Sequence, residues 1–197
     1  MNDIDSKFES YFSHLQKISF IGRIYKRFYT SPILFLCARR FGRHVVEVGS
    51  GTGNGVLGAF SSSVLGLEIN PVSVHYCNEI GLKADLIAGN GIFPVADDQF
   101  DVCVLDNVLE HIENPNITLN ECYRITKKAG GLIIAVPGLR GFKSDSDHKL
   151  FYGLNQLLKL DNRWQLSYSF SLPFLFKSET LSKYVKQYCL VAIYKKI

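Results

Sequence analysis

The chain contains short, mostly apolar runs that are separated by longer polar or mixed stretches. The runs lie at 45–48, 64–67, 84–88, 100–105 and 132–136, and each gives way to glycine, proline or a polar residue. Runs of this length are typical of strands that are buried on both faces of a parallel sheet. The intervening stretches leave room for crossover helices, so the pattern predicts an α/β fold around a parallel sheet.

The clearest helix signals follow the run at 100–105. Asn114 is a favoured N-cap, Pro115 suits the first helical position, and Gly130 and Gly131 are residues at which helices stop. These signals predict a helix between Asn114 and Gly130. Farther along, leucines predict a short helix at 154–160 and alternation predicts strands at 164–170 and 188–194, after a mostly polar loop at 139–149.

The first 40 residues show a different pattern. Apolar side chains recur at steps of three and four, which predicts one face of a helix: Phe8, Tyr11, Phe12, Leu15 and Ile18. An aromatic and basic stretch, 20–29, follows. We therefore expect an N-terminal helical extension at residues 1–40 and a main domain at 41–197. The simplest alternative for the extension is a helix packed on the core with a solvated basic face.

Composition narrows the class of protein. A chain of 197 residues with 47% hydrophobic residues can form one domain with a sizeable core, and a formal net charge of +4 predicts no nucleic-acid binding. The cysteines are odd in number, scattered and without a C-x-x-C pair, which indicates reduced thiols and a cytoplasmic location. We expect neither a signal peptide nor a transmembrane segment. The oligomeric state does not follow from these features.

The first apolar run leads directly into a glycine-rich loop with the pattern Glu-x-Gly-x-Gly-x-Gly at 47–53. Glycines let the backbone take positive φ and let a ligand approach main-chain atoms closely. A dinucleotide-binding fingerprint needs a third glycine where this chain has Asn54. The pattern instead resembles motif I of the class I S-adenosylmethionine-dependent methyltransferases.

A second segment strengthens the resemblance. The stretch 97–138, with strand, polar Asp106-Asn107, Glu110-His111 and a final apolar strand, closely resembles the methyltransferase type 11 group. The resemblance covers residues 41–140 and implies a Rossmann-like, seven-stranded, mostly parallel sheet with one antiparallel strand, helices on both faces and an N-terminal helical lid. It also implies a transferase that methylates small molecules.

The resemblance implies S-adenosylmethionine as the cofactor. Glu68 ends the second predicted strand, where a carboxylate suits the ribose hydroxyls, although a solvated strand end is the plain alternative. Asn90 stands where the family most often has an adenine-binding Asp, and an Asn-Gly turn is an equal alternative. The expected cofactor-binding residues are Glu47, Gly49, Ser50, Gly51, Gly53, Glu68, Ile69, Asn90, Gly91, Asp106 and Asn107.

Candidate catalytic residues are His111, which follows the fourth predicted strand, and His148 in the acceptor loop, because imidazole titrates near neutrality. For His111 the alternative is a role in ordering the loop. Metal-dependent relatives in the ubiquinone pathway carry Glu-x-x-Glu-His after strand four. Here Asn107 replaces the first acid and leaves Glu110 and His111, with His148 as a candidate third ligand. We therefore expect no metal.

The leading hypothesis is methyl transfer, as O-methylation, to a small-molecule acceptor such as a sugar or a lipid-linked intermediate. No Pro-Pro-Tyr or Pro-Cys sequence accompanies the fourth strand, which argues against adenine-amino and cytosine-C5 methylation. Alternatives are a non-catalytic, cofactor-binding regulator and an NAD-binding oxidoreductase. The aromatic and basic residues in 20–43 also suit peripheral contact with an anionic membrane.

Overall fold

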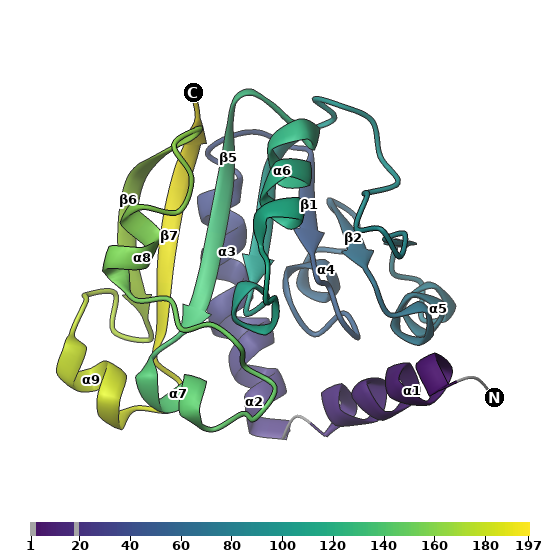
Figure 1. The fold of residues 1–197 in the computed structure, drawn as a ribbon, viewed down its shortest axis with the longest axis horizontal. Coiled ribbons are helices and arrows are strands. Elements are labelled where there is room, and N and C mark those ends of the chain that lie inside the picture. Colours follow the sequence, from purple (N-terminus) through teal and green to yellow (C-terminus); the bar gives the residue numbers. More distant parts are fainter. Residues whose placement is uncertain (1–2, 18–19) are drawn as a thin grey trace.

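The computed structural model describes residues 3–17 and 20–197 and is built around one seven-stranded sheet (Figure 1). The strand order is β3-β2-β1-β4-β5-β7-β6, and β7 runs antiparallel to both of its neighbours. The predicted mostly parallel sheet with one antiparallel strand is therefore confirmed. The strands are β1 Val45–Val48, β2 Val64–Glu68, β3 Ala84–Leu86, β4 Phe100–Asp106, β5 Thr126–Pro137, β6 Trp164–Leu172 and β7 Cys189–Lys196.

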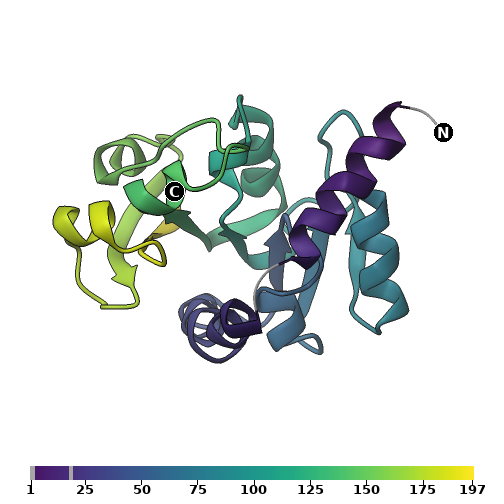
Figure 2. The same ribbon diagram turned by 90° about the horizontal axis from the view of Figure 1, so that it is seen from below.

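Helices cover both faces of this sheet (Figures 1 and 2). Side chains of α6 and α8 pack in the core on one face, and side chains of α3, α4 and α5 pack in the core on the other. The helical elements are α1 Asp3–Gln16, α2 Phe20–Tyr25, the π-helical turn η1 Lys26–Thr30, α3 Ser31–Ala38, α4 Val56–Ala59, α5 Pro71–Glu79, the 3₁₀ turn η2 Leu109–His111, α6 Asn116–Ile125, α7 Leu139–Lys143, α8 Leu154–Leu158 and α9 Glu179–Tyr184. Ile18, the last residue of the predicted helical face, lies outside the described residues.

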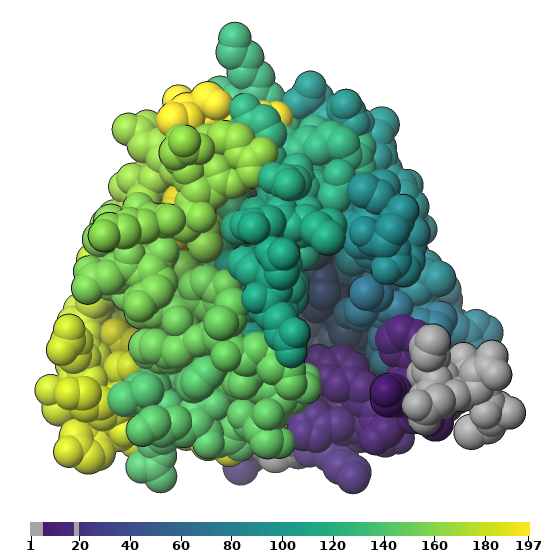
Figure 3. Space-filling model, in the orientation of Figure 1, coloured from purple at the N-terminus to yellow at the C-terminus, as the bar shows by residue number. Residues whose placement is uncertain are grey.

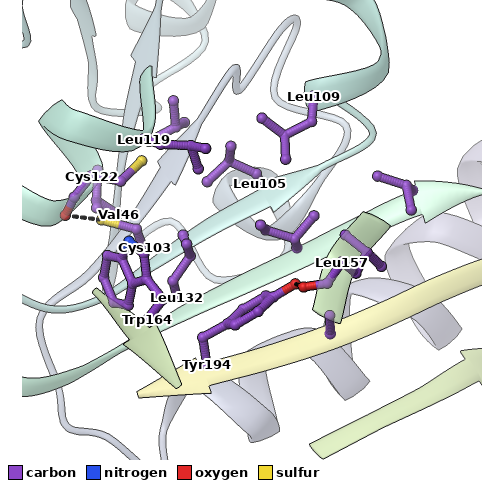
Figure 4. Packing of buried hydrophobic residues seen from close by; sticks show 14 of the residues in the cluster. Val46, Cys103, Leu105, Leu109, Leu119, Cys122, Leu132, Leu157, Trp164 and Tyr194 are labelled. Carbon is purple, nitrogen blue, oxygen red and sulfur yellow. Dashed lines mark hydrogen bonds between the residues drawn. The ribbon is translucent and has the colours of Figure 1, made fainter. Parts of the chain in front are cut away.

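The core on the α6 and α8 face joins residues that are far apart in the sequence (Figure 4). The Cys103 thiol is buried and lies 3.8 Å from the carbonyl oxygen of Cys122 in α6. The Tyr194 hydroxyl, also buried, donates to the carbonyl oxygen of Leu157 in α8 at 2.8 Å. Burying a polar atom is costly unless it is paired, so these bonds fix both helices on the sheet. All five cysteines carry free thiols, as the sequence indicates.

The predicted boundaries of α6 were wrong at its C-terminal end. The helix ends at Ile125, well before the glycines, and β5 begins at Thr126. The Thr126 hydroxyl donates to the carbonyl oxygen of Cys122 at 2.6 Å and so closes the last helical turn. Gly131 lies inside β5, where a Cβ would stand 2.5 Å from the Phe41 ring. Close packing on the sheet, and not helix termination, therefore requires this glycine.

The carboxyl ends of the parallel strands share one edge of the sheet, and α1, α2 and α7 lie along it (Figure 1). Asn70, directly after β2, ties α1 to this edge. Its side-chain oxygen accepts from the Val72 N–H and caps α5, while its amide nitrogen donates to the Phe8 carbonyl oxygen at 2.9 Å. Phe12 also packs edge-on against Tyr76 of α5. The extension therefore covers the edge where a ligand of an α/β sheet is expected.

In the described part of the chain, each helix lacks either the length or the apolar character that crossing a bilayer requires.

Candidate cofactor and acceptor site

A cavity of about 790 Å³ lies at the carboxyl edge of the sheet. Figure 3 shows a hollow between the N-terminal segment and the segment that follows β4. The cavity brings together all of the predicted site residues except Gly53 and Asn90. Asn90 is exposed, and its side-chain oxygen accepts from the Ile92 N–H at 3.1 Å in a local turn. Gly53 shapes the loop, because a Cβ there would meet Leu82.

The glycine loop after β1 has the backbone conformation that its sequence predicts. Gly49, Gly51 and Gly53 have φ values of 72°, 53° and 73°, in the left-handed region that L side chains rarely adopt. A Cβ on Gly49 would also stand 2.6 Å from a methyl group of Val108, which follows β4. The loop thus needs glycine both for its turn and for its close approach to the β4 end.

The Glu68 carboxylate at the end of β2 holds this loop in place. One of its oxygens accepts from the Gly51 N–H at 2.7 Å, and the other accepts from the Ile69 and Asn70 N–H groups at 2.8 and 2.9 Å. Burial raises the pKa of Glu68, and the three N–H donors oppose that rise. Because a carboxylate oxygen has two acceptor positions, the oxygen bonded to Gly51 keeps one for a further donor in the cavity.

Glu47 in β1 has a different local role. It is 2% exposed, and its two oxygens accept from the Val56 and Leu57 N–H groups at 3.0 and 2.7 Å, at the start of α4. Burial and the nearby Asp106 charge raise the pKa of Glu47 to about 7, against the effect of those N–H groups and of Lys26. We infer that Glu47 is a positioning residue that sets α4 and the glycine loop against each other.

A charge pair closes the cavity on the N-terminal side. Lys26 of η1 reaches Asp106 at the end of β4, with the ammonium nitrogen 3.0 Å from a carboxylate oxygen. Burial disfavours the Lys26 cation, but Asp106 outweighs burial and raises the pKa of Lys26. Asn107 has a φ of 58° and donates its side-chain N–H to the other Asp106 oxygen at 2.7 Å. Lys26 was not predicted as a site residue, although it lies in the basic and aromatic stretch 20–29.

The opposite wall of the cavity carries both predicted histidines. The His111 Nδ1 lies 3.1 Å from Asp147, and the His148 Nδ1 lies 2.8 Å from the carbonyl oxygen of Phe142. The two imidazole rings meet edge-on, with centroids 4.6 Å apart. Burial and the neighbouring His148 lower the pKa of His111, although Asp147 opposes this effect. His111 is therefore neutral at pH 7, as a proton acceptor must be.

Glu110, beside these histidines, is a residue to which the sequence analysis gave no catalytic role. It is fully buried, and burial followed by the Asp106 charge raises its pKa to about 8. Backbone bonds from Lys149 and Leu150 to the Glu110 carbonyl oxygen, at 2.6 and 3.1 Å, hold the His148 segment against it. Asp147 was likewise missed, since its partner His111 is distant in the sequence.

Comparisons with known proteins show which family the sequence resembles. Residues 46–134 match the family model of the methyltransferase domain. An uncharacterized methyltransferase of Mycobacterium leprae is 33% identical over 98 residues, which is 47% of this chain and 36% of that protein. A protein of Mycolicibacterium smegmatis named "Probable S-adenosylmethionine-dependent methyltransferase" is 28% identical over 118 residues, or 58% of this chain and 46% of that protein. The chain thus spans less than half the length of these relatives.

A solved structure shows a similar fold over the whole chain. The S-adenosylmethionine-dependent methyltransferase from Aquifex aeolicus superposes with a TM-score of 0.64 at 17% identity, covering 98% of each chain. At this identity the likeness supports the fold and leaves the acceptor open.

Replacing Glu47 with Gln tests whether burial raises the pKa of the Glu47 carboxyl. Since folding raises the pKa of Glu47 from 4.5 to about 7, ionisation costs the folded protein stability as the pH rises through this window. The glutamine lacks that cost but loses one acceptor for α4. We expect Glu47→Gln to be less stable than the wild type at about pH 5, and the deficit to shrink by up to about 3 kcal/mol by pH 8, in urea unfolding.

The matched control is Glu79→Gln on α5, because Glu79 is exposed and lies outside the cavity lining. A deficit for Glu47→Gln that stays constant across this pH range would contradict the raised pKa of Glu47.

Proposed function

We propose that the chain is a class I S-adenosylmethionine-dependent methyltransferase that transfers the methyl group of S-adenosylmethionine to a hydroxyl of a small-molecule acceptor. S-adenosylmethionine supplies an activated methyl group on its sulfonium sulfur, so the chain has to bind, align and shield the two reactants. The observation that carries the proposal is the glycine loop held by Glu68 beside the Lys26–Asp106 pair, within one cavity.

We assign the adenosyl part of the cofactor to the glycine loop and Glu68. The ribose has two hydroxyl donors, and Glu68 keeps acceptor capacity on the oxygen bonded to Gly51. Gly91, which lines the cavity with a φ of 81°, stands beside the proposed adenine position, while the Asn90 side chain is engaged in its own turn. We therefore give Asn90 at most a main-chain role in cofactor binding.

The methionine part of the cofactor suits Lys26 and Asp106. That part carries an ammonium and a carboxylate, and the pair offers the opposite charges 3.0 Å apart at the cavity wall. Binding there would exchange the internal ion pair for two ion pairs with the cofactor. Because Lys26 belongs to the extension and α3 packs in the core, we propose that α1, α2 and η1 act as the lid of the site and close over bound cofactor.

Other contacts support a lid role. Phe8, Tyr11 and Leu15 of α1 line the cavity, and a Cβ on Gly51 would stand 3.4 Å from Leu15. Burial and the Glu68 charge raise the pKa of Tyr11 to about 12, so its hydroxyl stays neutral and able to donate. The helix thus places an apolar cover and one neutral donor over the cofactor-binding residues, as exclusion of water requires.

His111 and His148 are the proposed proton acceptors. Methyl transfer would form an oxygen–carbon bond as the carbon–sulfur bond breaks, with the electron pair left on sulfur in S-adenosylhomocysteine, and the acceptor hydroxyl would lose its proton. The hydroxyl proton goes to the free Nε2 of an imidazole, and for His111 the Asp147 carboxylate stabilises the resulting cation. This role makes Asp147 a positioning residue.

The acceptor class follows from the surface beside the cavity. The extension exposes Phe20, Ile21 and Phe28 by 70%, 78% and 72%, and Arg23 and Arg27 stand among them. Clustered aromatic and basic side chains favour the headgroup region of an anionic bilayer. We therefore favour a sugar or lipid-linked acceptor that is reached at a membrane surface.

The first prediction is calorimetric. We expect the purified chain to bind S-adenosylhomocysteine with micromolar affinity, and Glu68→Gln to weaken binding by at least about tenfold, because the amide cannot replace every bond of a buried carboxylate. Glu79→Gln, outside the cavity lining, should bind like the wild type. NAD serves as the parallel ligand and should not bind.

Binding of NAD in place of S-adenosylhomocysteine, or of neither, would refute the cofactor assignment, provided that circular dichroism shows folded protein. Methyl transfer itself is tested by release of S-adenosylhomocysteine from S-adenosylmethionine with sugar and lipid-linked acceptors. If the chain binds the cofactor but releases no S-adenosylhomocysteine with any of these acceptors, the result would favour a non-catalytic regulator.

The second prediction concerns the membrane. The chain should float with vesicles that contain phosphatidylglycerol and remain unbound with phosphatidylcholine alone. Phe28→Ser should reduce flotation severalfold, because it removes an aromatic anchor from the extension. Leu158→Ser is the control, since Leu158 is 57% exposed on α8 and lies outside residues 20–43. Equal flotation of both variants would contradict this contact.

A further inference from the structure

Three potential ligand groups from two separate segments lie together: His111 and His148 line the cavity, and Glu110 is buried beside them. Glu110 and His111 belong to η2, directly after β4, and His148 belongs to the loop after α7. One ligand atom from each of the three lies within 4.8 Å of the others. The two backbone bonds from Lys149 and Leu150 to the Glu110 carbonyl hold the segments together.

Glu110 lacks the partners that a buried carboxyl needs. It is 0% exposed, and neither of its oxygens has a hydrogen-bond partner. Its nearest potential partner is the His148 Nε2, 4.0 Å from one oxygen, which is too far for a hydrogen bond. A buried polar group without a hydrogen-bond partner destabilises the folded protein, so a species that binds this carboxyl group would stabilise the site.

Both histidines keep a free Nε2, and that of His148 lies 4.0 Å from a Glu110 oxygen. A carbonyl oxygen only accepts, so the contact with Phe142 places the His148 proton on Nδ1 and leaves Nε2 bare. The Asp147 carboxylate does the same for His111. A carbonyl or carboxylate partner on the far ring nitrogen is the usual arrangement behind a metal-binding imidazole. Each imidazole therefore offers an acceptor nitrogen, and neither Nε2 is a donor.

We propose that Glu110, His111 and His148 bind one divalent transition-metal ion of the zinc or iron(II) class. Two imidazole nitrogens and one carboxylate oxygen match the ligand preference of these ions, whereas magnesium and calcium prefer oxygen. Ligand atoms around zinc stand about 3.3 Å apart, so the three groups, now within 4.8 Å of one another, have to close by up to about 1.5 Å on binding. Three protein ligands leave at least one position open to the cavity.

The proposed ligands are the three candidates that the sequence offers, and the proposal departs from the expectation of no metal. Asn107, which replaces the first acid of the Glu-x-x-Glu-His pattern, donates to Asp106 and takes no part. The third ligand is His148, and only the fold brings it to Glu110. This inference rests on the proposed function. With a metal bound, both imidazoles would be ligands instead of proton acceptors, and the metal would hold the acceptor hydroxyl and ease the loss of its proton to water.

The test is a titration of tag-free, chelator-treated full-length chain with Zn²⁺, followed by calorimetry, and by Co²⁺ absorption as a spectroscopic signature. We expect one equivalent to bind, and Glu110→Gln and His148→Ala each to weaken binding by more than about 100-fold. Asp147→Asn, which affects only the orientation of His111, should weaken it by about tenfold. His75→Ala is the control, because His75 is exposed on α5 and pairs with Glu79.

Absence of zinc binding to the folded wild type would overturn the proposal, and so would binding that persists unchanged in both ligand variants. Titration of the same samples with S-adenosylhomocysteine separates the two proposals. Zinc binding without S-adenosylhomocysteine binding would refute the cofactor assignment alone, and the converse would refute the metal site alone.

Discussion

The carboxylate of Glu68 is the interaction on which the rest of the site depends. It accepts from Gly51 in the loop after β1 and from Ile69 and Asn70 after β2, and so joins the ends of two neighbouring strands. A glycine loop alone is mobile, because glycine has many accessible conformations. The buried charge selects one conformation, and the three N–H donors compensate for its burial. The shape of the cofactor cavity follows from this arrangement.

The second constraint is that the extension is attached by polar contacts as well as apolar ones. Asn70 donates to the Phe8 carbonyl, Lys26 pairs with Asp106, and His14 lies 3.8 Å from Asp145 of the acceptor loop. Each of these contacts joins the extension to the cavity wall and not to the hydrophobic core. Polar contacts of this kind can be exchanged for contacts with a ligand at small cost, whereas core packing cannot. The attachment therefore suits a lid.

Sequence patterns predicted the sheet well, because each buried strand is a local apolar run. The positions of the glycine loop after β1 and of Glu68 at the end of β2 were also predicted, since motif spacing places them on consecutive strands. The end of α6 was predicted wrongly. Gly131 lets Phe41 pack closely on β5, and the local sequence does not show this contact. Lys26 and Asp147 were missed for the same reason, since each depends on a pairing between distant segments.

The most direct measurement of the central claim is hydrogen exchange of the backbone amides with and without S-adenosylhomocysteine. If Glu68 and the glycine loop hold the cofactor under the extension, exchange should slow at 49–55, at 68–70, at 106–111 and along α1. Protection that leaves 49–55 and 68–70 unchanged would contradict the assignment of the cofactor to this loop.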